Sequence, residues 1–302
     1  MTTFLQAVAG GLGQGSIYAL LALGFVIIYK SMRVVSFAQP AFMLAGALAV
    51  SFIAEPLLGM PSPWGFFLAL VLGAIGVALL GLGIERTVIR PMVGKPVFVI
   101  AIITLGIDIV VRLVANIFIG LDVRPVGDPW GLSSIDLGGV QVQERHIVML
   151  VTTVLLVVVL FAFFKYSRLG LAMRAASFNQ ETALAQGISV GTVFATSWAM
   201  AGALAAVAGT FQATGAGIDQ NLWIIALKAL PAIILGGLDS LGGAVIGGFT
   251  VGLVESLVAT YQGDYAPWLG QNFSVVSAYV VMLLVLLVRP YGLFGTKEVE
   301  RV

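Results

Sequence analysis

The chain has no cysteine and only one histidine, which excludes several kinds of chemistry at the outset. Without cysteine there is no disulfide framework and no thiol nucleophile. His146 alone leaves little scope for a metal site built from protein ligands. The signatures of phosphate-binding loops, zinc-protease helices and nucleophile elbows are also missing. We therefore predict a chain that is not an enzyme, holds no cofactor and does not itself bind ATP or magnesium.

Charge is equally scarce. Only 10% of the residues are charged, against about 25% in soluble domains. The hydrophobic fraction is 60% and the mean hydropathy is +1.07, more apolar surface than a soluble protein of 302 residues can bury. A net charge of +1 argues against nucleic-acid binding. The first six residues lack a basic stretch and a cleavage site, so we expect the first apolar run to be retained as a membrane span.

Apolar runs long enough to cross a bilayer, about 20 residues each, follow one another along the chain. They cover residues 5–29, 36–59, 64–84, 97–119, 146–164, 191–211 and 273–288. A longer stretch, 223–262, is broken near Gly236 and Gly237, which predicts a descending and an ascending segment, short and re-entrant in one interpretation. The alternation of barrel strands is absent. We predict a single all-α, polytopic membrane domain over residues 1–302, with about seven transmembrane helices and a glycine-rich broken hairpin.

Most of the fifteen basic residues fall on one side of this pattern. They are Lys30, Arg33, Arg86, Arg90, Lys95, Lys165, Arg168, Arg174, Arg289, Lys297 and Arg301. The opposite loops hold Glu55, Asp219 and Asp264, with Arg124 and Arg145 in a longer loop of mixed charge. The positive-inside rule then places the N-terminus outside and the C-terminus in the cytoplasm.

The 37 glycines include pairs spaced four residues apart, which let helices approach closely. The pairs are Gly11 with Gly15, Gly243 with Gly247 and Gly248 with Gly252. Ordinary helix packing is the simpler interpretation of each pair. The cluster over residues 236–252 is denser than packing alone needs, so a pathway or a moving element explains it as well as packing does.

A polar insert, residues 165–189, interrupts the apolar pattern with the sequence KYSRLGLAMRAASFNQETALAQGIS. Its charges are costly inside a bilayer and its basic residues place it on the cytoplasmic face. The spacing of Leu169, Ala172, Met173 and Ala176 predicts a helix with one apolar face.

A second short helix is predicted in the same insert. Asn179 can cap it, Glu181 lies in its first turn and Gly187 can end it. The result is a helix-turn-helix of about two turns each. It is either a solvated connector or a docking element for a cytoplasmic subunit.

Ionisable residues within apolar runs are functional candidates. Asp108 and Arg112, spaced i, i+4, favour a self-neutralised pair. Lys228, near the outer end of its segment, favours snorkelling to the interface. Glu255 lies deeper. It is either hydrogen-bonded within the bundle or makes a polar contact, along a pathway or with Lys228.

Other polar residues give weaker signals. His146 lies beside Glu144 and Arg145 at the start of a run, as an interfacial residue would. The uncharged Gln39, Gln212 and Thr214 could line a polar route.

Four stretches of the chain carry a family resemblance. RLGLAMRAASFNQETALAQGIS (168–189) resembles the cytoplasmic loop of permease subunits of bacterial branched-chain amino acid ABC importers. IYALLALGFVIIYKSMRVVSFA (17–38) resembles the first span and turn of that family. AIILGGLDSLGGAVIGGFTVGLVE (232–255) is similar to its glycine-rich hairpin, and RPYGLFG (289–295) to its terminal signature. The stretches occur in the family's order and the similarity covers nearly the whole chain.

The resemblance implies a function and a set of partners. It implies a subunit that translocates branched-chain or similar small amino acids delivered by an external solute-binding protein. The implied partners are two cytoplasmic ABC ATPase subunits, which hold ATP and magnesium, and a second permease chain, either a paralogue or a copy. The implied location is the bacterial cytoplasmic (inner) membrane.

The resemblance and the pattern of polar residues together predict roles for individual residues. The residues expected to couple to the ATPase are Arg168, Arg174, Ala175, Asn179, Glu181, Ala183, Leu184 and Gly187. Those expected along the translocation pathway are Gln39, Gln212, Thr214, Lys228, Gly236, Gly237 and Glu255.

One segment departs from the family. After Arg33 the family usually shows Asn-Phe-Ala-His-Gly-Glu a few residues on, whereas this chain has SFAQPA over residues 36–41. A His and a Glu are lost, and Pro40 restricts the backbone where glycine would free it. The cargo is therefore left open, with urea or a short amide as alternatives. A stand-alone channel or ion-coupled carrier is the alternative of another class.

Overall fold

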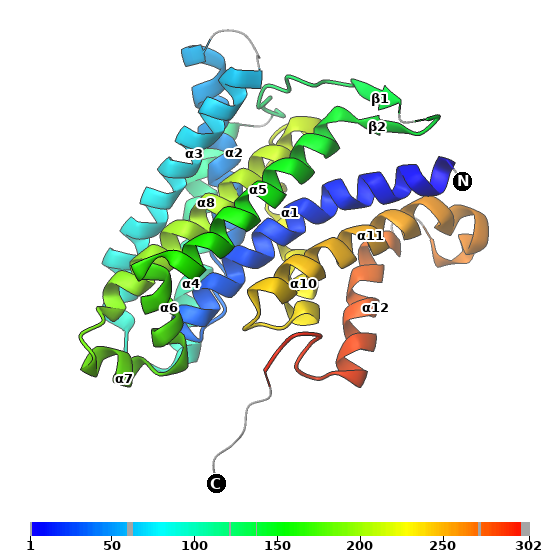
Figure 1. The fold of residues 1–302 in the computed structure, drawn as a ribbon. Helices are drawn as coiled ribbons and strands as arrows, with labels where there is room; N and C mark the ends of the chain where they lie inside the picture. The colour runs from blue at the N-terminus through cyan, green and yellow to red at the C-terminus, as the bar shows by residue number, and fades with distance from the viewer. Residues whose placement is uncertain (1, 59–62, 121, 137, 271–272, 297–302) are drawn as a thin grey trace. The chain divides into compact units, whose positions relative to one another are not determined.

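A computed structural model describes residues 2–58, 63–120, 122–136, 138–270 and 273–296. Most of them are helical (Figure 1). The long helices are α1 (Thr2–Met32), α2 (Gln39–Leu58), α3 (Pro63–Ile84), α4 (Val97–Ile119), α5 (Glu144–Tyr166), α8 (Val190–Ala216), α11 (Leu241–Tyr265) and α12 (Phe273–Val288). The shorter ones are α6 (Arg168–Phe178), α7 (Gln180–Ala185), α9 (Ile224–Leu227), α10 (Ala229–Gly236), a π-turn at Glu85–Ile89, and 3₁₀ turns at Arg90–Met92 and Pro267–Leu269.

The predicted apolar runs became helices. The runs at 97–119 and 273–288 coincide with α4 and α12, and the others end within a few residues of the observed helices. Among the described residues, six helices are long and apolar enough to cross a membrane, and further apolar helices are shorter. The prediction of an all-α, polytopic membrane protein is confirmed. The number of crossings and the orientation of the termini stay predictions.

The broken stretch forms two arms of unequal length. Helix α10 has eight residues and rises about 12 Å, less than the roughly 30 Å of a hydrocarbon core. Helix α11 has 25 residues and is long enough to span. The break lies at Gly237, whose φ of 105° suits glycine, and Ser240 then caps α11 by accepting from the Gly243 amide at 3.0 Å.

A small hairpin lies in the loop between α4 and α5, where no strand was expected. Strands β1 (Ser134–Asp136) and β2 (Gln141–Gln143) pair antiparallel, with Ile135 opposite Val142. Three-residue strands are too short for alternation to show in the sequence, which is why the prediction missed them.

Contacts divide the chain into two compact units. The first unit comprises residues 1–26, 130–153 and 227–302, and the second comprises residues 27–129 and 154–226. Helices α1 and α5 therefore contribute residues to both units. The prediction of a single domain remains a prediction.

Glycines bring the helices of the first unit close together. Helix α11 runs antiparallel along α1, because Gly11 lies against Leu253 and Gly15 against Phe249 (Figure 1). A Cβ atom added at Gly15 would lie 2.9 Å from the Phe249 Cα, so a larger residue has no room there. Between membrane helices such close contact is a main source of association energy. Packing thus accounts for the predicted glycine pairs.

The C-terminal segment folds back onto the end of α10. The amides of Leu293 and Phe294 donate to the carbonyls of Leu235 and Gly236, at 2.8 and 3.1 Å. Thr296 contacts Asp239 in the turn that follows. The last carbonyls of a helix have no partner within it, so this segment supplies the donors that α10 lacks.

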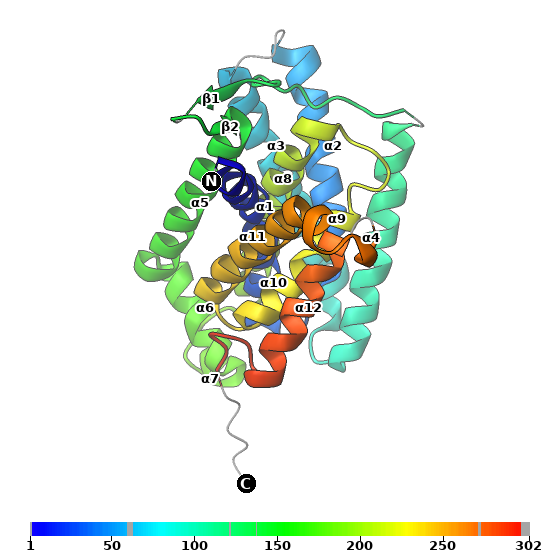
Figure 2. The same ribbon diagram turned by 90° about the vertical axis from the view of Figure 1, so that its right-hand side faces the viewer.

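In the second unit, α8 packs against α2 and α3 (Figure 2). Gly81 on α3 lies against the Trp198 carbonyl, and Gly202 on α8 against that of Val77. Trp198 is only 1% exposed and meets Phe42 edge to face, with ring centroids 5.9 Å apart. The core of this unit therefore lies where α8 crosses α2 and α3.

Candidate functional site: a buried charge cluster and a polar helical insert

Lys228 and Glu255 form an ion pair in the first unit. The Lys228 Nζ lies 2.5 Å from the Glu255 Oε1, and the two side chains are 20% and 14% exposed. Lys228 directly precedes α10 and Glu255 lies on α11, so the pair joins the short and the long arm of the hairpin. This is the contact with Lys228 that the sequence analysis named as one alternative for Glu255, and whether Lys228 also reaches the membrane interface stays a prediction.

Tyr18 completes what we call the polar cluster, defined as Tyr18, Lys228 and Glu255. Its hydroxyl donates to the Glu255 Oε2 from α1, and its side chain is fully buried. The sequence analysis missed Tyr18, although a tyrosine in an apolar run needs a hydrogen-bond partner for its hydroxyl. The Glu255 carboxylate therefore accepts from two donors on two other elements.

The polar cluster holds both signs of charge in an apolar setting. Removing two charges from water is costly, and the pair is tolerated only because attraction and hydrogen bonds compensate each partner. Such a cluster can exchange its internal partners for the ammonium and carboxylate of a zwitterion. It contains no nucleophile with an adjacent general base.

Asp108 and Arg112 form the predicted self-neutralised pair on α4, in the second unit. The Asp108 Oδ2 lies 2.6 Å from the Arg112 Nη2 and 2.8 Å from its Nε. The Arg112 guanidinium also lies over the Trp223 ring, 3.9 Å from its centroid, a cation–π contact that the sequence did not reveal. The two charges therefore compensate each other, as the sequence analysis predicted for a structural pair.

The uncharged pathway candidates differ in their surroundings. Gln39 is fully buried, and neither side-chain amide atom has a hydrogen-bond partner in the part of the chain that the structure describes. The Thr214 hydroxyl donates to the Phe211 carbonyl of its own helix. Gln212 also lies on α8. These three residues belong to the second unit, whereas Lys228, Glu255, Gly236 and Gly237 belong to the first.

Gly236, Gly237 and His146 also have definite positions. Gly236 lies against the Gly243 backbone, and Gly237 makes the left-handed turn after α10. His146 lies in the first turn of α5 and packs on Gly13, where an added Cβ atom would lie 2.7 Å from the imidazole Cδ2. Whether His146 meets the membrane interface stays a prediction.

The polar insert folds as two capped helices, α6 and α7 (Figure 2). The Asn179 Oδ1 accepts from the Thr182 amide at 3.0 Å, as a helix cap does. Gly187, with φ of 79°, ends α7, and Ile188 donates to the Ala183 carbonyl at 3.0 Å. The predicted cap and stop are confirmed. Helix α6 is longer and α7 shorter than the two turns expected of each.

The two faces of the insert differ in burial. Met173, Ala176 and Ala183 are buried, whereas Leu169, which was predicted to share the apolar face, is 41% exposed. Of the residues expected to couple to a partner, Arg168, Arg174, Glu181 and Leu184 are exposed and Ala175 is half-buried.

Phe178, which the sequence analysis overlooked, projects from the turn between α6 and α7 with 90% of its surface exposed. Leu184 on α7 is 57% exposed. Exposed large apolar side chains on a polar segment are typical of a contact surface, so Phe178 and Leu184 are candidates for one.

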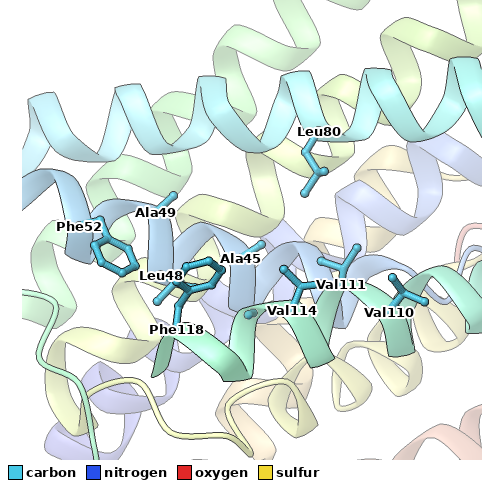
Figure 3. Close-up of a pocket in the computed structure, with 10 residues that line it drawn as sticks. Ala45, Leu48, Ala49, Phe52, Leu80, Val110, Val111, Val114 and Phe118 are labelled. Carbon is cyan, nitrogen blue, oxygen red and sulfur yellow. The ribbon is translucent and has the colours of Figure 1, made fainter. Parts of the chain in front are cut away.

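An apolar groove lies among α2, α3 and α4 in the second unit (Figure 3). It has a volume of about 640 Å³ and is lined by Ala45, Leu48, Ala49, Phe52, Leu80, Val110, Val111, Val114, Ala115 and Phe118. Phe52 and Phe118 lie toward one end and Val110 toward the other. Because these side chains are all aliphatic or aromatic, the groove offers nothing to bind a polar solute.

Comparison with known proteins decides the family. The family model described as "Branched-chain amino acid transport system / permease component" matches residues 7–288. The chain belongs to this permease family. It is therefore a transport subunit and a multi-pass membrane protein, and the resemblance drawn from the four sequence stretches is confirmed.

Relatives of this permease match it over almost its full length. The "High-affinity branched-chain amino acid transport system permease protein LivH" of Salmonella typhimurium is 30% identical, covering 99% of this chain and 98% of its own. The corresponding protein BraD of Pseudomonas aeruginosa is 31% identical with the same coverage. The "Probable branched-chain amino acid transport permease protein LivH" of Methanocaldococcus jannaschii is 30% identical over 97% of this chain and 93% of its own.

Among solved structures, "PsaBC from Streptococcus pneumoniae in complex with Fab" aligns with a TM-score of 0.48 at 14% identity. The alignment covers 96% of this chain and 93% of that chain. This similarity is too low to support an inference about the permease.

Proposed function

We propose that the permease is the membrane-spanning subunit of an ATP-driven ABC importer for branched-chain or similar small amino acids. The observation that carries this proposal is the full-length similarity, at 30–31% identity, to permeases named for that transport. The proposed location is the bacterial cytoplasmic membrane. The proposed partners are two cytoplasmic ATPase subunits, a second permease chain and an external solute-binding protein.

The polar cluster supports a zwitterionic cargo. During passage, Glu255 can pair with the ammonium group of an amino acid and Lys228 with its carboxylate, so each charge keeps a partner. Tyr18 retains Glu255 through its hydroxyl while the ion pair opens. In this proposal the pair is a polar station on the pathway, and ATP hydrolysis on the partners supplies the free energy.

The polar insert supports docking of an ATPase on the cytoplasmic side. Its exposed Phe178 and Leu184 provide apolar anchors, and Arg168, Arg174 and Glu181 provide a charged rim. Asn179 and Gly187 define the ends of α7 and so fix the direction in which Leu184 points.

A reconstituted transport assay tests the proposed function. The permease is reconstituted in vesicles with a second permease chain, two ATPase subunits and the solute-binding protein. Uptake of leucine, valine, urea, short amides and sugars is then measured with ATP. We expect ATP-dependent uptake of branched-chain amino acids only when the binding protein is present. Uptake without ATP, driven by an ion gradient, would point to the alternative carrier class.

Docking is tested separately by co-purification. Phe178→Asp and Leu184→Asp place charges in the proposed contact and should abolish ATPase co-purification. Leu132→Asp changes a leucine outside the insert that is 89% exposed, more than Leu184 and about as much as Phe178, and serves as the control. Undiminished co-purification of both insert variants would count against the docking role.

Gln39 favours a second candidate cargo. Where the family usually has histidine, this chain has a buried glutamine whose amide oxygen and nitrogen lack partners among the described residues. An amide can donate to and accept from another amide, so urea or a short amide would satisfy both atoms. Preferential uptake of these solutes, reversed by Gln39→His, would support this second candidate.

A further inference from the structure

The polar insert is fastened to the end of α1 by two side-chain hydrogen bonds. The Gln180 Nε2 donates to the Ser31 carbonyl at 2.8 Å, and the Arg33 Nη2 donates to the Ser177 carbonyl at 2.9 Å. All four residues belong to the second unit. Each bond joins residues more than 140 positions apart, so both are tertiary contacts that local sequence does not impose.

The two bonds are reciprocal. Ser31 lies in the last turn of α1 and Ser177 in the last turn of α6, where carbonyls have no partner within the helix. Arg33 follows α1 and donates a hydrogen bond to the end of α6. Gln180 is the first residue of α7 and donates to the end of α1. Each element therefore completes the other's helix end. Ser31 is buried and Gln180 half-buried, so their bond is better shielded from water than that of the exposed Arg33.

The backbone of Arg33 is held in an unusual conformation. Its φ is 56°, and among the described residues it is the only non-glycine with a positive φ. This left-handed conformation costs a residue with a Cβ atom roughly 1–2 kcal/mol and persists where the surroundings impose it. Here it turns the chain out of α1 while the guanidinium reaches α6.

Helix α1 extends from this contact without a break. Tyr18 lies on the same helix, 13 residues before Ser31, which is about 20 Å along the axis. The Tyr18 hydroxyl binds Glu255 of the polar cluster. The insert also packs on its chain neighbours, since Gly170 lies against the Phe163 carbonyl of α5 and both α6 and α7 contact α8. The two hydrogen bonds add α1 to these contacts.

We propose that these two bonds form a clamp that makes α1 the rod through which the insert acts on the polar cluster. The clamp consists of the Gln180 and Arg33 side chains with the carbonyls of Ser31 and Ser177. This proposal rests on the proposed function. The clamp stays closed through the transport cycle, so a displacement of α6 and α7 by the ATPase moves α1 and with it Tyr18. Gln180 and Arg33 are positioning residues, since they act through α1 and do not touch the cargo.

Substitutions in the reconstituted transporter test the clamp, with solute transported per ATP hydrolysed as the readout. Gln180→Ala should lower this ratio about tenfold, as loss of one shielded hydrogen bond can. Arg33→Ala should lower it less, because its bond is exposed. The matched controls are Gln186→Ala and Arg86→Ala, which remove the same side-chain types at exposed positions that make no side-chain hydrogen bond among the described residues.

A reversible cross-link makes the test independent of folding. The chain has no cysteine, so Ser31→Cys with Gln180→Cys can be joined by a cleavable cross-linker that carries two thiol-reactive groups. Before joining, the double variant should be uncoupled. After joining it should regain coupling, and cleavage should remove the gain. A merely structural role for Gln180 would give no such reversible change.

The failure of the clamp is distinguishable from failure of the proposed function. If the ATPase never co-purifies with the unaltered permease, the proposed function fails. If it co-purifies, and the combined Gln180→Ala and Arg33→Ala variant still transports the normal amount per ATP, the clamp alone is refuted. A cross-link that stops transport would also overturn it, because the clamp would then have to open.

Discussion

At the scale of single residues, the Lys228–Glu255 pair is the contact on which most depends. Both side chains are largely withdrawn from water, so each charge relies on the other and on Tyr18. Sequence analysis recognised Glu255 and Lys228 as unusual and named their pairing as one alternative. It could not choose between pairing and snorkelling, because the reach of Lys228 depends on how α10 folds back on α11.

Replacing one partner of this pair should destabilise the permease more than replacing both partners. Glu255→Leu leaves Lys228 buried without a partner and should lower the free energy of unfolding by about 3–5 kcal/mol. Adding Lys228→Met should recover most of that loss. Thermal unfolding in lipid nanodiscs measures both. If the single variant is as stable as the double variant, water already compensates Lys228 and the pair is not buried as described.

At the scale of elements, hydropathy predicted the long helices because the bilayer sets their length. It could not predict what depends on long-range contacts. The split of α9 from α10, the β1–β2 hairpin and the contact between the insert and α1 all escaped it. The capping of α7 was predictable, because Asn179 and Gly187 act on their own helix.

Close packing of α11 on α1 gives an element-scale prediction. At Gly248 a Cβ atom would collide with the Ala19 backbone, whereas at Gly106 on α4 it would meet nothing within 4 Å. Gly248→Ala should therefore lower the melting temperature and the yield of folded permease. Gly106→Ala, the matched control, should leave stability unchanged or raise it by up to about 1 kcal/mol, since alanine is the better helix former. Equal effects of the two changes would contradict the packing of α11 on α1.

The cap of α7 gives a second prediction at the scale of elements. Asn179→Ala removes the acceptor for the Thr182 amide and should destabilise α7 by about 1 kcal/mol. The short helix should then fray, and affinity for the ATPase should fall several-fold. Asn179→Asp keeps the acceptor and should preserve binding. Hydrogen exchange of residues 180–185 and titration with the ATPase report the two effects, and unchanged exchange in Asn179→Ala would argue against the cap.

At the scale of the whole molecule, the remaining question is which face meets the cytoplasm. The charge distribution predicts that the insert faces inward and that the loop between α4 and α5 faces outward. Composition alone predicted the membrane class, and the family match confirmed it. Orientation stays a prediction, since a helix bundle has the same internal contacts whichever way it is inserted.

Labelling with a membrane-impermeant maleimide tests the orientation in intact cells. The cysteine-free chain gives no background. Leu132→Cys should react at once, because that side chain is exposed in the outer loop. Phe178→Cys should react only after the cells are permeabilised. If Phe178→Cys reacts in intact cells and Leu132→Cys only after permeabilisation, the predicted orientation is wrong. The insert would then lie outside the cell, where no ATPase can dock.

The contact of residues 293–296 with α10 determines when, during synthesis of the chain, the end of α10 can be completed. The donors that complete α10 follow α12 in the chain, so they leave the ribosome after α1 to α12 have been made. Until then the carbonyls of Leu235 and Gly236 lack these partners. A product that terminates before residue 293 therefore keeps two carbonyls at the end of α10 without these donors.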